Sequence, residues 1–178
     1  PLKMLALEQT RVDDLAPLAG MKLEKLYLNQ TSVRDLGPLA GMPLTELMLV
    51  GTRVENLDPL RGAPLTGLWV NQAPVTNLAG LAGCPLLTLT LEGTQVRDLQ
   101  PLAGMKTLQR LHIGDTPVQD LAPLAGLPLT RLIFNPGRIT NGLDAIRQLP
   151  SLQELGVTLE GRMTPAAFWK QVDEGTLR

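Results

Sequence analysis

Residues 23–43, which read LEKLYLNQTSVRDLGPLAGMP, contain the pattern that determines the fold of this 178-residue chain. A shift of 21 residues superimposes this segment on the sequence before and after it, and one 22-residue step occurs at Lys106-Thr107. Regular repetition at this period predicts stacked copies that share one core. One apolar column of the repeat contains Leu5, Leu26, Leu47, Leu68, Leu89, Leu111, Leu132 and Leu155.

Each copy predicts a short strand followed by a tight turn. Leu26 and Leu28 are two residues apart, the spacing at which strand side chains share a face, so both should point inward. The apolar spacing then loosens to three, which suits a 3₁₀ helix or a single helical turn. Pro is tolerated in that first turn, and a following Gly permits the chain to reverse. The candidate caps that precede the turns are Asp14, Asp35, Asn56, Asn77, Asp98 and Asp120.

The motif L-x-x-L-x-L-x-x-T-x-V-x-D-L-x-P-L-A-G-M resembles that of leucine-rich-repeat proteins, specifically the short internalin-like class, over residues 2–159. The resemblance implies an α/β-type repeat solenoid. It would be a right-handed arc with a concave parallel β-sheet and short 3₁₀ or helical turns on the convex side. We expect about eight leucine-rich repeats in residues 1–159, and a C-terminal capping helix and tail in residues 160–178.

The chain departs from this family at the ninth position of the motif, where Asn or Cys is usual. Thr occupies the place in most copies, with Ala73 and Gly137 as exceptions. A hydroxyl has one donor where an amide has two. We therefore expect a weaker hydrogen-bond ladder that still satisfies some buried carbonyls and is interrupted at Ala73 and Gly137.

The two ends of the repeat array differ. No capping pattern precedes Leu2, so the first strand should present an open apolar edge, and we expect the natural protein to continue beyond it as a longer, monomeric chain. At the other end, Thr164 is a candidate N-cap and Pro165 a first helical residue, followed by an apolar stripe that includes Phe168 and Trp169. This tail also resembles the terminal segment of some planctomycete-type bacterial repeat proteins.

Composition excludes several classes of partner. The formal net charge is −1 without a run of either sign, so neither nucleic acid nor an anionic membrane surface is indicated. No apolar stretch approaches the length that spans a bilayer. Cys84 is the only cysteine, which rules out an internal disulfide and favours a reducing compartment such as the cytoplasm.

The residues between the inward-facing leucines should face the concave side of the sheet. This central column contains Ala6, Tyr27, Met48, Trp69, Thr90, His112, Ile133 and Gly156. Tyr27, Met48 and Trp69 lie on consecutive strands, so their side chains should touch, and exposed aromatic residues beside Met are typical anchors of a binding surface. The alternative is that these three side chains only pack together against the sheet backbone.

A second concave column includes Arg110 and Arg131, which are neighbours and suit the acidic side chains of a partner. Mutual neutralisation with Glu92 and Asp115 is the interpretation that we favour, because exposed ion pairs are common and weak. His112 is the only histidine, and no orienting group or activated nucleophile accompanies it. One His and one Cys do not make a metal site, so we expect no catalytic residue, no metal and no cofactor.

These features predict a non-enzymatic module that binds a protein partner with its concave sheet face. Two alternatives remain open. In the first alternative, the chain is a regulatory or sensor arm of a larger bacterial signalling enzyme, such as a Ser/Thr kinase. In the second, it is a surface adhesion module, which would need more exposed aromatic residues.

Overall fold

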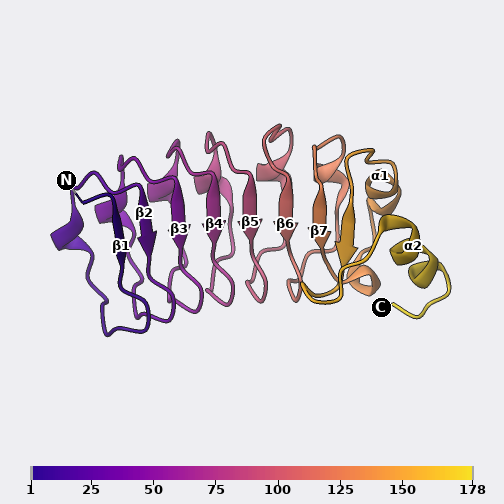
Figure 1. Cartoon of the computed structure of the whole chain (residues 1–178), viewed down its shortest axis with the longest axis horizontal. Helices are drawn as coiled ribbons and strands as arrows, with labels where there is room; N and C mark the ends of the chain where they lie inside the picture. The colour runs from indigo at the N-terminus through magenta and orange to yellow at the C-terminus, as the bar shows by residue number, and fades with distance from the viewer. Residues whose placement is uncertain (1, 178) are drawn as a thin grey trace.

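The computed structural model describes residues 2–177 and contains a single open sheet of eight parallel strands in chain order. Figure 1 shows the strands side by side along the molecule, from the N-terminal end to the C-terminal helices. Neighbouring strands pair residue for residue at the repeat spacing, as between Leu26 and Leu47. The strands are β1 (Met4–Ala6), β2 (Lys25–Tyr27), β3 (Glu46–Met48), β4 (Gly67–Trp69), β5 (Thr88–Thr90), β6 (Arg110–His112), β7 (Arg131–Ile133) and β8 (Glu154–Gly156).

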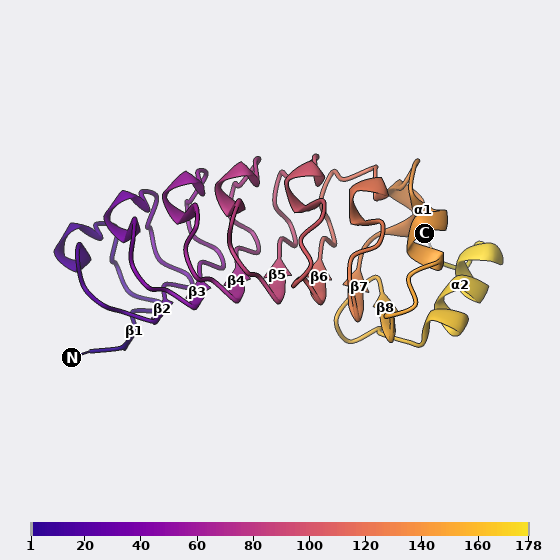
Figure 2. The same cartoon turned by 90° about the horizontal axis from the view of Figure 1, so that it is seen from above.

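Short 3₁₀ helices form the opposite side of the arc, so the predicted solenoid of leucine-rich-repeat type is confirmed. Figure 2 shows the strands along the inner, concave edge and the 3₁₀ helices along the outer edge. The backbone N–H that opens each turn donates to the Asp or Asn side chain two residues earlier, at 2.7–2.8 Å, in all six predicted caps. The helices are η1 (Ala16–Leu18), η2 (Gly37–Leu39), η3 (Asp58–Leu60), η4 (Ala79–Leu81), η5 (Gln100–Leu102) and η6 (Ala122–Leu124).

The core is a continuous spine of inward-facing leucines and valines between the two sides of the arc. Leu47, Leu68 and Leu89 have no exposed surface. Cys84 is buried in the same spine, as its repeat position predicts, and burial raises the pKa of its thiol above the ordinary value. Because each repeat packs mainly on its neighbours, the arc is stabilised locally along its whole length.

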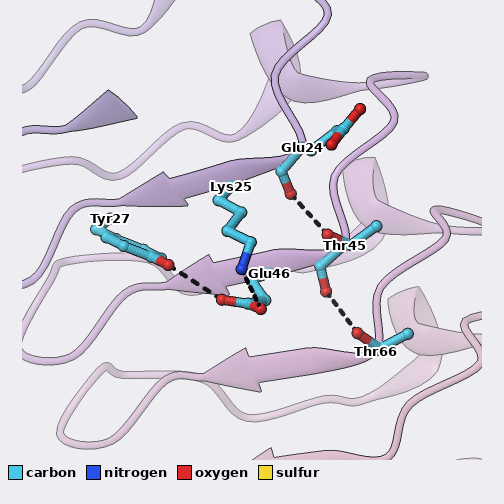
Figure 3. Close-up of polar contacts among 6 residues, drawn as sticks. All are labelled: Glu24, Lys25, Tyr27, Thr45, Glu46 and Thr66. Carbon is cyan, nitrogen blue, oxygen red and sulfur yellow. Dashed lines mark hydrogen bonds and ion pairs between the residues drawn. The ribbon is translucent and has the colours of Figure 1, made fainter. Parts of the chain in front are cut away.

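The expected ladder at the ninth motif position is wrong in its geometry. Each Thr hydroxyl there, as in Thr31 and Thr94, donates to the carbonyl three residues earlier in its own repeat, at 2.6–2.7 Å. A ladder between repeats lies instead beside the start of the strands. The Thr45 hydroxyl donates to the Glu24 carbonyl at 3.0 Å, and the Thr66 hydroxyl donates to the Thr45 carbonyl at 3.1 Å (Figure 3). At the ninth position the Thr hydroxyl instead bonds to a carbonyl of its own turn, as short polar side chains commonly do in turns.

The fourth repeat brings its convex helix unusually close to the one before it. Gly80 stands in η4 where most of the other convex helices have Pro, and a Cβ at this position would lie 2.2 Å from the backbone carbonyl of Leu57. The Gly62 N–H also donates to the Ala82 carbonyl at 3.0 Å, and the Cys84 thiol donates to the Leu60 carbonyl at 3.2 Å. Gly80 is therefore required by close packing at this step of the arc.

The seventh repeat and the tail close the C-terminal end. The seventh repeat contains η7 (Pro136–Arg138) and a short helix α1 (Leu143–Arg147). The tail forms α2 (Pro165–Asp173), whose Thr164 hydroxyl accepts from the Ala167 N–H at 3.4 Å.

The apolar stripe of α2 packs over the last repeats, as the sequence predicts. Phe168 is fully buried, and its ring centroid lies 5.4 Å from that of Phe134. The Arg147 guanidinium lies 4.4 Å from the centre of the Trp169 ring and forms an ion pair with Asp173. The closing helix thus contributes a small aromatic cluster to a core otherwise filled by aliphatic side chains.

Candidate concave binding face

The central column lies on the concave face, but its exposure declines towards the C-terminal end. Tyr27, Met48 and Trp69 are half-buried and are aligned with one another by the strand register. Thr90, His112 and Ile133 were expected to be open to solvent, and the structure corrects this, since their exposed fractions are 9%, 3% and 0%. The exposed part of the column therefore consists of its N-terminal half.

The segment 157–163 returns beside β8, next to the C-terminal half of the column. Leu155 and Met163 form an antiparallel pair, with N–H···O distances of 3.0 and 2.8 Å. Gly156 leaves room for this return, because a Cβ there would lie 2.9 Å from a carbonyl oxygen of the segment. Leu159 of the same segment lies beside the central column. Figure 2 shows this part of the chain on the concave side of β7 and β8.

Tyr27 is held by a polar network that spans β2 and β3 (Figure 3). Its phenol donates to Glu46 at 3.0 Å, and the Lys25 ammonium donates to the other oxygen of Glu46 at 2.8 Å. The hydrogen bond from Lys25 lowers the pKa of Glu46 below its ordinary value, whereas burial, followed by the hydrogen bond to Glu46, raises the pKa of Tyr27. These contacts fix the Tyr27 ring in one orientation on the concave face.

Trp69 lies flat along its own strand. A Cβ on Gly67 would lie 2.5 Å from the six-membered part of the indole, so Gly67 provides the space into which the ring folds. Met48, on the strand before, accepts a weak hydrogen bond at its sulfur from Asn29 at 3.6 Å. Trp69 does pack against sheet backbone, and it keeps partial exposure on the concave side.

The two arginines of the second column have different partners from those expected. Arg131 forms an ion pair with Glu154, which also lies 3.7 Å from Arg162. Arg110 is exposed, and its guanidinium donates to the Thr88 hydroxyl at 3.4 Å.

The expected neutralisation of the arginines by Glu92 and Asp115 is therefore wrong. Glu92 accepts from Asn71 at 3.2 Å and lies 3.9 Å from the His112 ring, and Asp115 lies 3.9 Å from Arg138. Glu154 neutralises Arg131 because β8 places it directly opposite in the strand register.

A hollow of about 290 Å³ lies where the exposed and covered halves of the column meet. Trp69 forms one side of it, while Ile133 and Leu159 line it from the C-terminal half. The full set of lining residues is Trp69, Asn71, Thr88, Thr90, Arg110, Leu111, His112, Arg131, Ile133 and Leu159. The hollow thus combines apolar walls with several polar groups.

Two solved structures of Listeria monocytogenes proteins share this architecture. Internalin C2 is 30% identical in sequence, with a TM-score of 0.76, and the alignment covers 84% of this chain and 68% of that one. The chain belongs to the internalin-like leucine-rich-repeat proteins. A second internalin is 24% identical with a TM-score of 0.73, and the alignment covers 86% of this chain. The present chain spans 54% of that internalin's length. No protein-family model and no curated protein sequence matches the chain.

Several residues that shape the face of this internalin-like arc were not recognised as such from the sequence. Gly156 appears there as an ordinary member of the central column and Leu159 only as the end of the repeats, while Gly67 belongs to the second concave column. Gly114 has a similar role, because a Cβ on it would lie 2.8 Å from the His112 ring. A glycine in an outward-facing strand column is the signal that could have been noticed, since such positions allow a side chain or backbone segment to approach closely.

His112 is buried in this internalin-like face, and neither of its ring nitrogens has a hydrogen-bond partner within residues 2–177. Burial lowers the pKa of His112 below its ordinary value and outweighs the attraction of Glu92 and Asp115. Within residues 2–177, no group of three His, Cys, Asp or Glu side chains is placed to hold a metal ion. Over the same residues, no helix is both long and apolar enough to cross a bilayer.

Proposed function

We propose that the concave face binds a protein partner, with Tyr27, Met48 and Trp69 as its central anchors. The single observation that carries the proposal is the alignment of these three half-buried side chains on β2, β3 and β4. Membership of the internalin-like repeat proteins supports an interaction or adhesion module as a class. Aromatic and Met side chains on a preformed surface lose little conformational freedom on binding, which favours them as interface anchors.

The N-terminal half of the face is the better candidate for first contact. Its Tyr27 ring is held by Glu46 and needs no rearrangement before a partner docks. The exposed Arg110 extends the proposed surface towards β6, whereas Arg131 is already paired with Glu154. Thr90, His112 and Ile133 are buried and line the hollow beside Trp69. The proposed surface is therefore a flat anchor region that continues into a recess.

A binding experiment with two matched variants tests the proposal. Ligands selected from a displayed polypeptide library against the wild-type chain should bind Trp69→Ala at least about tenfold more weakly, as expected for the loss of an aromatic anchor. Arg97→Ala is the control, because Arg97 is exposed beside the convex helix η5. Ligands that bind Trp69→Ala as tightly as the wild type would contradict the proposal, provided that both variants melt near the wild-type temperature.

We expect the module itself to be non-enzymatic, as the sequence predicts. The only histidine is buried, and the only cysteine is an inward-facing core residue with a raised pKa. Surface adhesion is the alternative that internalin-like membership favours, and the regulatory arm of a signalling enzyme stays a prediction from the sequence.

A further inference from the structure

Four buried polar atoms of residues that line the hollow have no hydrogen-bond partner within residues 2–177. They are Asn71 Oδ1, Thr90 Oγ1 and both ring nitrogens of His112. All three residues line the hollow, and Thr90 and His112 are more than nine-tenths buried. Buried polar groups are almost always paired in folded proteins, because an unpaired one loses its hydration without compensation. Their concentration at one recess of the concave face indicates a site built for a ligand.

The unpaired groups of Asn71, Thr90 and His112 together offer both kinds of hydrogen bond. Burial holds the pKa of His112 below 6.5, so its neutral ring has one N–H donor and one acceptor nitrogen. The Thr90 hydroxyl can donate and accept, while Asn71 Oδ1 only accepts. A matching ligand group must therefore donate one hydrogen bond and accept another within a small space.

The walls of the hollow favour an apolar, planar ligand group. The Trp69 indole lies flat over Gly67 on one side, and the side chains of Ile133 and Leu159 also line the recess. The volume of about 290 Å³ lies at the lower end of the range of about 300–1,000 Å³ that is usual for small-ligand pockets, and it is large enough for one side chain. An aromatic ring between an indole and aliphatic side chains is a favourable arrangement.

We propose that this hollow receives the side chain of a tyrosine from the polypeptide that binds the concave face. This inference rests on the proposed protein-binding function and deepens it. The phenol hydroxyl donates to His112 or Asn71 and accepts from Thr90 or the His112 N–H, while the ring packs against Trp69. Tyrosine is also among the residues most enriched at interfaces, since it buries a large apolar area with a hydroxyl at the tip.

A carboxylate fits the same recess less well. It would offer acceptors only and would leave Asn71 Oδ1 and the acceptor nitrogen of His112 unpaired. Glu92 lies 3.9 Å from His112, and Glu160 adds further negative potential at that ring. Arg110 lines the hollow as well and could attract an anion, so a carboxylate probe belongs in the test.

Nuclear magnetic resonance of the whole chain tests the proposal, because His112 is the only histidine and gives a single imidazole signal. N-acetyl-tyrosinamide should shift that signal and the Ile133 methyl signals. It should bind about fivefold more tightly than N-acetyl-phenylalaninamide, as expected for one net hydrogen bond. Thr90→Val should remove most of this preference, whereas Thr76→Val, at an exposed position, should retain it.

Three results would overturn the tyrosine inference. They are equal binding of the tyrosine and phenylalanine probes, tighter binding of N-acetyl-aspartate amide at the same signals, and no shift up to the solubility of the tyrosine probe. These probes do not depend on any protein partner. If the tyrosine probe fails these tests but Trp69→Ala still weakens binding of the library-selected ligands, only the tyrosine site is rejected. If the tyrosine probe binds as expected but Trp69→Ala binds the library-selected ligands as tightly as the wild type does, the proposed protein-binding surface is rejected.

Discussion

At the scale of the residue, threonines at different places in the repeat have different roles, according to what lies beside each of them. Thr94 and Thr31 satisfy carbonyls of their own repeats, whereas Thr45 and Thr66 join neighbouring repeats. Thr90 is buried and unpaired in the hollow. These five threonines therefore act as local backbone partners, as links between repeats or, for Thr90, as a candidate ligand contact.

The carboxylate of Glu46 provides a prediction of pH dependence at this scale. The hydrogen bond from Lys25 holds the pKa of Glu46 below 4.5, so its contribution to stability is present above that value and is lost as pH falls through the lower, folded-state pKa. Glu46→Gln should lower the melting temperature at neutral pH. The corresponding loss in the free energy of unfolding should be less than about 1 kcal/mol, because the Lys25–Glu46 pair is partly exposed. The difference from wild type should vanish in acid.

Thermal melting across pH is the measurement, and Glu55→Gln is its control. The Glu55 carboxylate lies 3.8 Å from Arg34 on a well-exposed surface, so its substitution should change little at any pH. A Glu46→Gln difference that persisted in acid would show that the lost contact is not electrostatic.

At the scale of the element, the convex 3₁₀ helices are interchangeable except at η4. Most of them begin with an Asx-capped turn and place Pro in the first turn. In η4 the Pro is replaced by Gly80, against which the backbone of Leu57 packs directly. The exception in the sequence thus marks the closest approach between two convex helices.

Gly80→Pro would restore the repeat motif, yet it should destabilise the protein. The added ring atoms would begin within 2.2 Å of the Leu57 carbonyl, and backbone cannot move aside as a side chain can. We expect a loss of about 2–3 kcal/mol in the free energy of unfolding, measured by denaturant titration. Gly37→Ala is the control, because a Cβ there approaches only the Asp35 side chain, at 3.1 Å. Equal stability of wild type and Gly80→Pro would contradict this packing argument.

At the scale of the whole molecule, the arc is a series of neighbour contacts closed at its C-terminal end. Together, the helix α2 and the segment 157–163 cover the end of the core and shape the concave face. Phe168 covers the core beside Phe134, and Leu159 narrows the concave face beside the hollow. The end cap is therefore also part of the candidate site.

Removal of the cap contact should have a local effect, because stability in a solenoid spreads from neighbour to neighbour. Phe168→Ala should cost about 3–5 kcal/mol at the C-terminal end. Hydrogen exchange should show the largest loss of protection in β7 and β8, with β2 and β3 little changed. Uniform loss of protection along all eight strands would instead show that the arc unfolds as a single cooperative unit.

The sequence predicts the elements of this fold well and the details of its binding face less well. The strand positions, the six Asx caps and the Thr164 cap of α2 are confirmed, because each is set by residues close together in the chain. Of the candidate site, the alignment of Tyr27, Met48 and Trp69 is confirmed, since a constant repeat length imposes the register. The predicted exposure of His112 and Ile133 is wrong, because exposure depends on which other parts of the chain pack against the sheet.

The repeat alone determined that the leucines stack inward and that the residues between them lie on one curved sheet, since a fixed period leaves no other common core. Only the tertiary structure decided which part of that sheet meets solvent. The segment 157–163 has no repeat period, and its return beside β8 follows from its pairing with Leu155 and the space above Gly156. Burial arises from contacts between distant segments, and a periodic pattern carries no information about the one segment that departs from it.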